Sequence, residues 1–267
     1  MADLGLICIV AVANLLVGGC IGLTGFAGFL LPMIYAGFLG MGPVEGMALA
    51  FSAFIVSGLA GCPAYRKTGD LPLRESAGLL AGSFAGALVG TKVGLLLPAA
   101  VLTVVLYVVV LVSGSSCLVQ MVQARLRAAR PAEDAGTAHT PGQRAVSAPV
   151  FVLIGLVTAV ICAASGAGGP VLVIPVLLLL GVPARRAVGM SLIDSVAVSL
   201  PAAVGYLAGG TISALTWSLL PVALVAHGVG AVVGAANAHR IDAPTLKTIV
   251  AVGAVAVAVV KLAMLVL

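Results

Sequence analysis

The stretch 161–175, ICAASGAGGPVLVIP, decides which fold this sequence can adopt. It lies inside a long apolar run, yet residues 165–169 are all small, and Pro170 follows them. Glycine and proline are the residues that the interior of a helix tolerates least. The run is therefore predicted to form two short helices joined by a break.

The composition of the whole chain indicates an integral membrane protein. Of its 267 residues, 62% are hydrophobic and 8% are charged, with a mean hydropathy of +1.27, whereas a soluble domain has about 25% charged residues. The apolar runs are far longer than about 18 residues, and strand-like alternation is absent, so the spans are predicted to be helices. The net charge of +5 does not indicate a nucleic-acid partner, and the five cysteines have no metal or redox spacing, so neither a metal nor another cofactor is expected.

Polar segments divide the apolar runs into two sets, and this division predicts the domain organisation. Residues 1–122 are predicted to form a first membrane repeat, residues 123–148 a flexible cytoplasmic linker, and residues 149–267 a second membrane repeat. The runs of the first set are 4–40, 43–63, 73–97 and 99–122, and those of the second are 149–182, 187–207, 215–236 and 244–267.

The two sets are predicted to be copies of one another. A shift of 141 positions places TGFAG at 24–28 on SGAGG at 165–169, and a shift of 144 places GALVG at 86–90 on GAVVG at 230–234. Helix breaks at matching places in two halves are typical of transporters that are built from repeats. The predicted fold is an all-α polytopic membrane protein with two inverted-topology repeats, each a broken-helix hairpin plus three transmembrane helices.

The distribution of charge predicts the orientation. The first run of each set has about 36 residues, too many for one crossing of about 20. If each run is a hairpin that returns to its own side, eleven of the 13 basic residues lie on one side of the membrane; with single crossings they would split seven to four. The positive-inside rule then places both termini on the periplasmic side of the inner membrane. The eleven residues are Arg66, Lys67, Arg74, Arg125, Arg127, Arg130, Arg144, Arg185, Arg186, Arg240 and Lys247.

Several motifs together resemble those of the TauE/SafE family of sulfite exporters and organosulfonate permeases. They are GLTGFAGFLLP at 22–32, AASGAGGPVLVIP at 163–175, Leu180-Gly181, AVGMS at 187–191, and Tyr206 followed by Gly209 and Gly210. The first half is degenerate, because EGMALAF stands where AVGMSLI is expected. The resemblance implies a secondary transporter that moves sulfite or a short organosulfonate across a bacterial inner membrane.

The two breaks supply the predicted substrate site. A helix that stops inside a membrane exposes backbone groups that lipid cannot satisfy. The N–H groups at the start of a half-helix favour an anion, and glycine lets an anion approach the backbone closely. We therefore predict an anion site near the midplane, unless the glycines serve only close helix packing. The candidate substrate-binding residues are Thr24, Gly25, Gly28, Ser165, Gly166, Gly168, Gly169 and Ser191.

Four ionisable side chains lie within the predicted spans, where each costs about 2.5–3.5 kcal/mol to insert. Lys92 and Lys261 are near helix ends, so their side chains are expected to reach the membrane surface. Asp194 and His227 lie deeper. They are candidates for proton coupling, and hydrogen-bonded packing is the alternative for both.

Small residues recur every four positions in both halves, a spacing typical of close helix packing. The packing partner is either the other half or a second copy of the chain in a homo-oligomer. Tyr65 and Tyr206 are expected to anchor the protein at the membrane surface. The small residues are Gly82, Gly86, Gly90 and Gly94 in the first half, and Ala226, Gly230, Gly234 and Ala238 in the second.

Two other functions compete with a transporter. A passive anion channel could use the same site. AASG at 163–166 together with His227 also resembles the serine–histidine dyad of intramembrane proteases, because a nucleophilic serine needs a base within reach. The repeat explains SGAGG without hydrolysis, however, so enzymatic activity is not expected.

Overall fold

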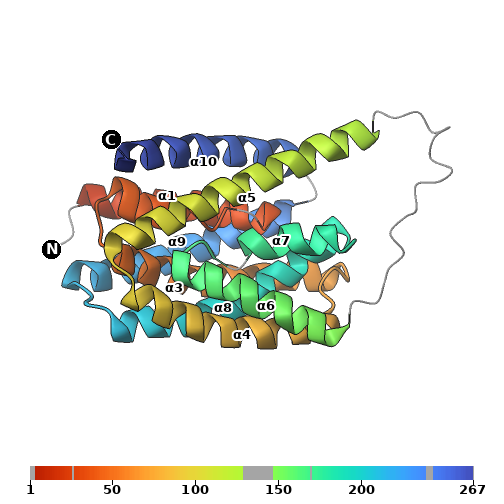
Figure 1. The fold of residues 1–267 in the computed structure, drawn as a ribbon, viewed down its shortest axis with the longest axis horizontal. Helices are drawn as coiled ribbons and strands as arrows, with labels where there is room; N and C mark the ends of the chain where they lie inside the picture. Colours follow the sequence, from red (N-terminus) through yellow and green to blue (C-terminus); the bar gives the residue numbers. More distant parts are fainter. Residues whose placement is uncertain (1–3, 26, 129–146, 169, 239–242, 267) are drawn as a thin grey trace.

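The computed structural model describes residues 4–25, 27–128, 147–168, 170–238 and 243–266, and all regular structure in these ranges is helical (Figure 1). Seven of the described helices are long and apolar enough to span a membrane. The elements of the first half are α1 (Leu4–Thr24), α2 (Leu30–Pro32), the π-helix η1 (Met33–Phe38), α3 (Pro43–Lys67), α4 (Leu73–Leu96) and α5 (Ala99–Ala128). Those of the second half are α6 (Ala148–Ser165), α7 (Pro170–Leu179), α8 (Ala184–Gly209), α9 (Ala214–Asn237) and α10 (Ala243–Val266).

Both long apolar runs are broken where the sequence predicts. After α1, Gly25 has a φ of +66°, and after α6, Gly166 has a φ of +78°. These two glycines are counterparts at the shift of 141, and their left-handed conformation ends a helix at little steric cost. The same pairing recurs at the far end of each hairpin, where Gly40 and Gly181 have φ values of +65° and +82°. Left-handed glycines therefore stand at matching positions at both ends of the two hairpins.

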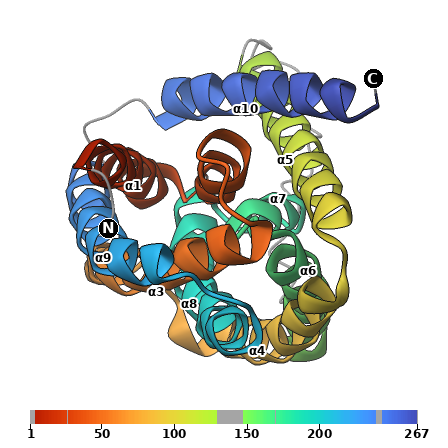
Figure 2. The same cartoon turned by 90° about the vertical axis from the view of Figure 1, so that its left-hand side faces the viewer.

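Helix packing is reciprocal between the halves (Figure 2). Helix α1 packs along α9, and α6 packs along α4. Helices α3 and α8 cross each other, while α3 also contacts α9 and α8 contacts α4. Helices α5 and α10 pack together. By position in the two halves, α1 corresponds to α6, α3 to α8, α4 to α9, and α5 to α10. If each helix is exchanged for its counterpart, the set of helix pairs in contact stays the same.

The two chain ends lie at one end of the bundle, while α5 finishes and α6 begins at the opposite end (Figure 1). This placement fits two halves that each begin with a hairpin. The opposite orientation of the halves in a bilayer stays a prediction, as does the side on which the termini lie.

The small-residue stripes pack against the other half of the same chain. A Cβ atom added to Gly82 or Gly86 of α4 would overlap a backbone carbonyl oxygen of α6. A Cβ atom added to Gly230 or Gly234 of α9 would overlap a carbonyl oxygen of α1. These stripes therefore bring helix backbones into contact within one molecule and leave no room for a second copy there.

Helix α5 extends beyond residue 122, the predicted end of the first membrane repeat, and the division into two repeats and a linker stays a prediction. Helix α5 continues to Ala128, because residues 123–128, QARLRA, are strong helix formers that extend the helix beyond its apolar part. Ala148, the last residue of the predicted linker 123–148, is the first residue of α6. The remainder of that linker, 129–146, lies outside the described residues.

Candidate functional site

The two breaks meet in the middle of the bundle around one aromatic ring. A Cβ atom added to Gly28 in the first break would lie 3.2 Å from the carbonyl oxygen of Ala167 in the second. The same atom would lie 3.5 Å from Cζ of Phe54, and a Cβ atom on Gly168 would lie 3.1 Å from Cε2 of that ring. The buried side chain of Phe54, on α3, thus lies between the breaks.

Each break is also covered by the central helix of the opposite half. A Cβ atom on Gly25 would lie 3.0 Å from Val188 of α8, and one on Gly166 would lie 2.9 Å from Met47 of α3. Val188 and Met47 are themselves counterparts at the shift of 141. The surroundings of the two breaks therefore repeat, although the side chains differ.

The three hydroxyl groups predicted to bind substrate are buried, and each donates a hydrogen bond to a carbonyl oxygen of its own helix. The bonds run from Thr24 Oγ1 to Cys20 at 2.8 Å, from Ser165 Oγ to Cys162 at 3.4 Å, and from Ser191 Oγ to Val188 at 2.8 Å. A hydroxyl group has only one proton to donate, so a bound anion would have to replace these bonds.

The structure brings most of the predicted binding residues to this one region. Ser191 Oγ is 3.2 Å from the position of a Cβ atom on Gly25, which places this serine of α8 beside the first break. Ser165 Oγ also accepts a hydrogen bond of 3.3 Å from the amide of Ala167, inside the second break. Gly169 lies outside the described residues.

Two counterpart tyrosines bind the carbonyl groups that precede the breaks. Tyr65 Oη donates to the carbonyl oxygen of Gly22 at 3.3 Å, and Tyr206 Oη donates to that of Ala163 at 2.8 Å. Each acceptor lies three residues before the left-handed glycine of its break. Both tyrosines are buried, so the prediction that they anchor the protein at the membrane surface is wrong. The two tyrosines match at the shift of 141, and this match could have indicated that both have the same structural role.

Asp194 is fully buried on α8, and both of its carboxyl oxygens lack a hydrogen-bond partner among the described residues. The hydroxyl group of Ser83 on α4 is within reach of this carboxyl group, although the pair does not meet hydrogen-bond geometry. A buried carboxyl group without a partner is costly to keep ionised inside a membrane protein.

His227 on α9 is also fully buried, and it lies in a different polar group. Its Nδ1 atom is 3.2 Å from the carbonyl oxygen of Asn14, while Nε2 has no partner in the described part of the chain. Asn14 Nδ2 donates to Tyr35 Oη at 2.6 Å, which links α9 through α1 to η1. The His227 ring lies 5.9 Å from that of Phe54. Asn14 was not identified as a functional candidate from the sequence. Its amide side chain in an otherwise apolar run could have indicated a buried hydrogen-bonding role.

Asp194 and His227 occupy related positions in the two halves. At the shift of 144, the counterpart of His227 is Ser83, the residue that lies next to Asp194. Asp194 therefore lies where α8 contacts α4, and His227 lies where α9 contacts α3. These two helix contacts correspond to each other in the two halves. Ser165 and His227 bond to different partners, so the structure shows no serine–histidine dyad between these two residues.

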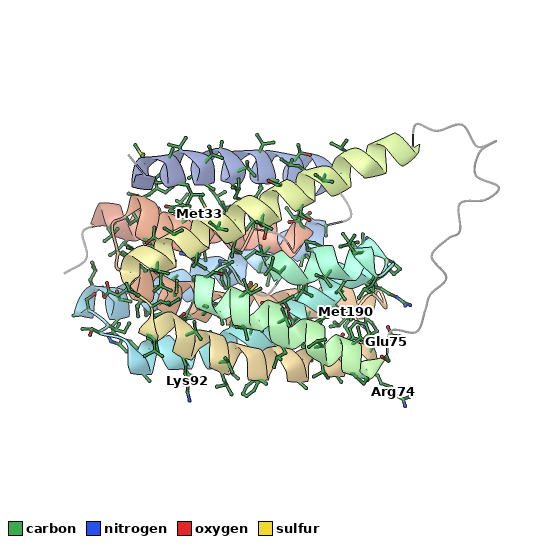
Figure 3. The ribbon with its side chains drawn as sticks, viewed as in Figure 1. Met33, Arg74, Glu75, Lys92 and Met190 are labelled. Atoms are coloured by element: carbon green, nitrogen blue, oxygen red, sulfur yellow. The ribbon has the colours of Figure 1, made fainter. Side chains whose placement is uncertain are left out.

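The two lysines within the spans behave differently. Lys92 is exposed on α4 and points away from the bundle (Figure 3), and its reach to the membrane surface stays a prediction. Lys261 instead donates a hydrogen bond of 2.9 Å to the carbonyl oxygen of Gly37 in η1. Its half-buried side chain thus contacts the first hairpin, a contact that the sequence did not predict.

Polar contacts join the halves at both ends of the bundle. At one end, Arg185 Nε lies 3.0 Å from Asp70 Oδ2, which also accepts a 2.6 Å hydrogen bond from the Thr68 hydroxyl. The Thr68 hydroxyl and the Arg185 guanidinium hold the pKa of Asp70 below its usual range. At the other end, Glu45 Oε1 accepts hydrogen bonds from the amide of Ser213 at 2.7 Å and the hydroxyl of Thr216 at 3.0 Å.

Comparison with known proteins gives one result that covers nearly the whole chain. The family model described as Sulfite exporter TauE/SafE matches residues 6–260. Comparison with curated proteins and with solved structures finds no match. Members of the matched family are membrane transporters and not enzymes. With its broken helices and seven apolar spans, the chain belongs to the TauE/SafE sulfite exporter family.

Proposed function

We propose that this protein is a secondary transporter that carries a small anion, sulfite or a short organosulfonate, across the bacterial inner membrane. The observation that carries the proposal is the meeting of two counterpart breaks, with left-handed Gly25 and Gly166, around Phe54. The match to a sulfite exporter family supports the class of substrate. The basic residues of the predicted cytoplasmic loops support termini on the periplasmic side.

Backbone groups rather than charged side chains are proposed to bind the anion. The left-handed glycines turn the chain where a side chain would block access, and broken helices in transporters direct amide groups at anionic substrates. Thr24, Ser165 and Ser191 can each supply a hydroxyl donor once its bond within the helix is released. Phe54 fills the space between the breaks in this conformation, so its ring must move when substrate binds.

The polar contacts at the two ends support a carrier rather than an open channel. Asp70 with Arg185 and Glu45 with Ser213 join opposite halves at opposite ends of the bundle. A carrier exposes its site to one side at a time, so each contact is proposed to open in turn. Both contacts are present in this conformation, which fits a state that is closed at both ends.

Proton coupling is proposed to use Asp194, with His227 as a second candidate. Asp194 has two unpartnered oxygens and lies three residues from Ser191 on the same helix. Binding or release of a proton there would alter the contact of α8 with α4 through Ser83. A change at this contact can reach the break, because α8 also covers Gly25.

A counterflow experiment in proteoliposomes tests the proposal. Vesicles loaded with unlabelled sulfite, taurine, isethionate or sulfoacetate are diluted into a trace of the same labelled anion. A carrier accumulates label transiently above its equilibrium level, whereas a channel only equilibrates it. No protein-dependent movement of any of these anions would reject the proposed substrate class.

A further inference from the structure

An apolar cleft separates the first hairpin from the last helix. It has a volume of about 240 Å³, and the residues that line it are all apolar in type. Leu30, Met33 and Phe38 contribute from the hairpin, and Gly253 and Val257 contribute from α10. Helix α10 crosses the outside of the bundle, where it packs mainly on α5 (Figure 2). The cleft therefore lies at the periphery of the bundle.

Lys261 places a positive charge at one end of this cleft. Its Nζ atom lies 5.4 Å above the centre of the Phe38 ring, which lines the cleft, and it donates to the Gly37 carbonyl oxygen. An ammonium group has three N–H donors, so two remain for another acceptor. Lys261 lies five residues before Val266, the last residue of α10, roughly 8 Å along a helix, and a lysine side chain can extend over such a distance toward the membrane surface.

Two properties of the cleft identify the chemistry of its occupant. An apolar surface at the outside of a membrane protein contacts acyl chains, and the α10 residues Val252, Val260 and Met264 are each at least half exposed beside it. A lysine near the membrane surface attracts anionic head groups. We propose that the cleft holds one acyl chain of an anionic phospholipid, with Lys261 bound to the phosphate of the same molecule.

The site is specific to one half of the protein. At the shift of 144 the counterpart of Lys261 is Cys117 on α5, which carries no charge at neutral pH. This counterpart position on α5 therefore supplies no second lysine of this kind. Because Gly37 belongs to the second limb of the first hairpin, bound lipid would lie next to one of the two broken helices.

A crosslinking experiment tests this site. Purified full-length protein in nanodiscs receives a trace of phosphatidylglycerol with a photoreactive group in its acyl chain, and the crosslinked peptides are identified by mass spectrometry. We expect adducts on the segments 28–38 and 250–261. Gly253→Leu should reduce them at least fivefold, because nothing lies within 4 Å of a Cβ atom at Gly253 and the larger side chain would fill the cleft. Val252→Leu, on the exposed side of the same helix, is the matched control.

Lys261→Gln tests the contribution of the lipid head group separately from that of the acyl chain. In wild type, unlabelled phosphatidylglycerol should compete for the site at least fivefold better than phosphatidylcholine with the same acyl chains, and Lys261→Gln should abolish this preference. Inorganic phosphate should not compete. Equal competition by both lipids in wild type, competition by inorganic phosphate, or unchanged adducts in a folded Gly253→Leu protein would each overturn the proposal. Crosslinks between two protein chains at these segments would assign the cleft to a second copy instead.

Discussion

Ser195 donates a hydrogen bond of 3.2 Å to the carbonyl oxygen of Phe54, the residue 141 positions earlier in the chain. The two residues are counterparts at the shift that aligns the breaks. Counterparts of two copies related by a two-fold rotation come into contact only near the axis. If the halves are related in this way, the axis passes through the crossing of α3 and α8, and Phe54 stands beside it.

The position of Phe54 leads to a prediction about substrate size. Phe54→Leu removes part of the ring between Gly28 and Gly168, so bulkier sulfonates should gain uptake relative to sulfite. The ratio of isethionate to sulfite uptake in proteoliposomes is expected to rise severalfold. Phe151→Leu is the control, because Phe151 is also buried but packs beside Gly78 of α4 rather than between the breaks. A ratio that changes equally in both variants would show that Phe54 does not set the size of the site.

Crowding the second break should weaken substrate binding. In Gly168→Ala the added methyl group meets the Phe54 ring, and the residue must keep a φ of +77°, a conformation that costs an L-residue about 1–2 kcal/mol. Titration of the purified protein with sulfite should show an affinity reduced by about tenfold or more. Gly19→Ala is a suitable control, because its nearest neighbour would lie at an ordinary 3.8 Å. Gly86 and Gly234 are poor controls, since alanine there would overlap a helix backbone. Wild-type affinity in a folded Gly168→Ala protein would place the site elsewhere.

The matched hydroxyl groups should contribute to binding in both halves. Thr24→Val and Ser165→Ala each remove a hydrogen bond to the anion, which contributes about 1.5–3 kcal/mol to binding. In wild type, the hydroxyl must first give up its bond within the helix, which costs about 1 kcal/mol and reduces the net loss in the variant. Each variant should therefore lose roughly twofold to thirtyfold in affinity for sulfite. Isothermal titration of each folded variant measures this loss. An effect in only one variant would restrict the site to one half, and none in either would leave these hydroxyls as helix-bonding groups.

Much of the fold could be predicted from the sequence because its determinants are local. The breaks follow from glycines at matched positions, and every predicted span has helix at nearly the same residues. The reach of α5 to Ala128 could not be predicted from hydropathy, because helix propensity continues where apolar character stops. The Tyr206 bond to Ala163 and the Lys261 bond to Gly37 join segments far apart in the chain, so their partners emerge only from the packing. The proximity of Phe54 to both breaks is likewise a property of the assembled helices.

Asp194 should govern any dependence of transport on pH. Asp194→Asn keeps the size of the side chain but cannot bind or release a proton, so the variant should transport isethionate, a sulfonate that stays ionised throughout, at a rate that varies little between pH 5 and 8. His227→Gln provides the parallel test for the other half, where Nδ1 bonds to Asn14. Initial uptake rates across this range provide the measurement. If both variants keep the wild-type pH profile, these residues serve packing and carry no proton.

The Asp70–Arg185 pair should not contribute to that pH profile. Since Thr68 and Arg185 lower the pKa of Asp70, the stability that this carboxylate provides is present above its unfolded pKa of about 3.9. It is lost only as the pH falls through the still lower folded value. The pair is therefore intact throughout the range from pH 5 to 8. As a partly exposed ion pair it stabilises the fold by about 1 kcal/mol or less, so its neutralisation should affect access to the site more than folding.

Opening either end contact should expose the site from that end only. In a variant without the native cysteines, Ser191→Cys places a thiol beside the first break. Asp70→Asn should then speed its reaction with a membrane-impermeant maleimide added from the Asp70 side, because the ion pair to Arg185 is lost. Glu45→Gln should speed the reaction from the opposite side, because it weakens the bonds to Ser213 and Thr216. Glu75→Gln, an exposed acid at the Asp70 end (Figure 3), should change neither rate. Equal acceleration from both sides in either variant would contradict a carrier with two separate closures and favour a continuous pore.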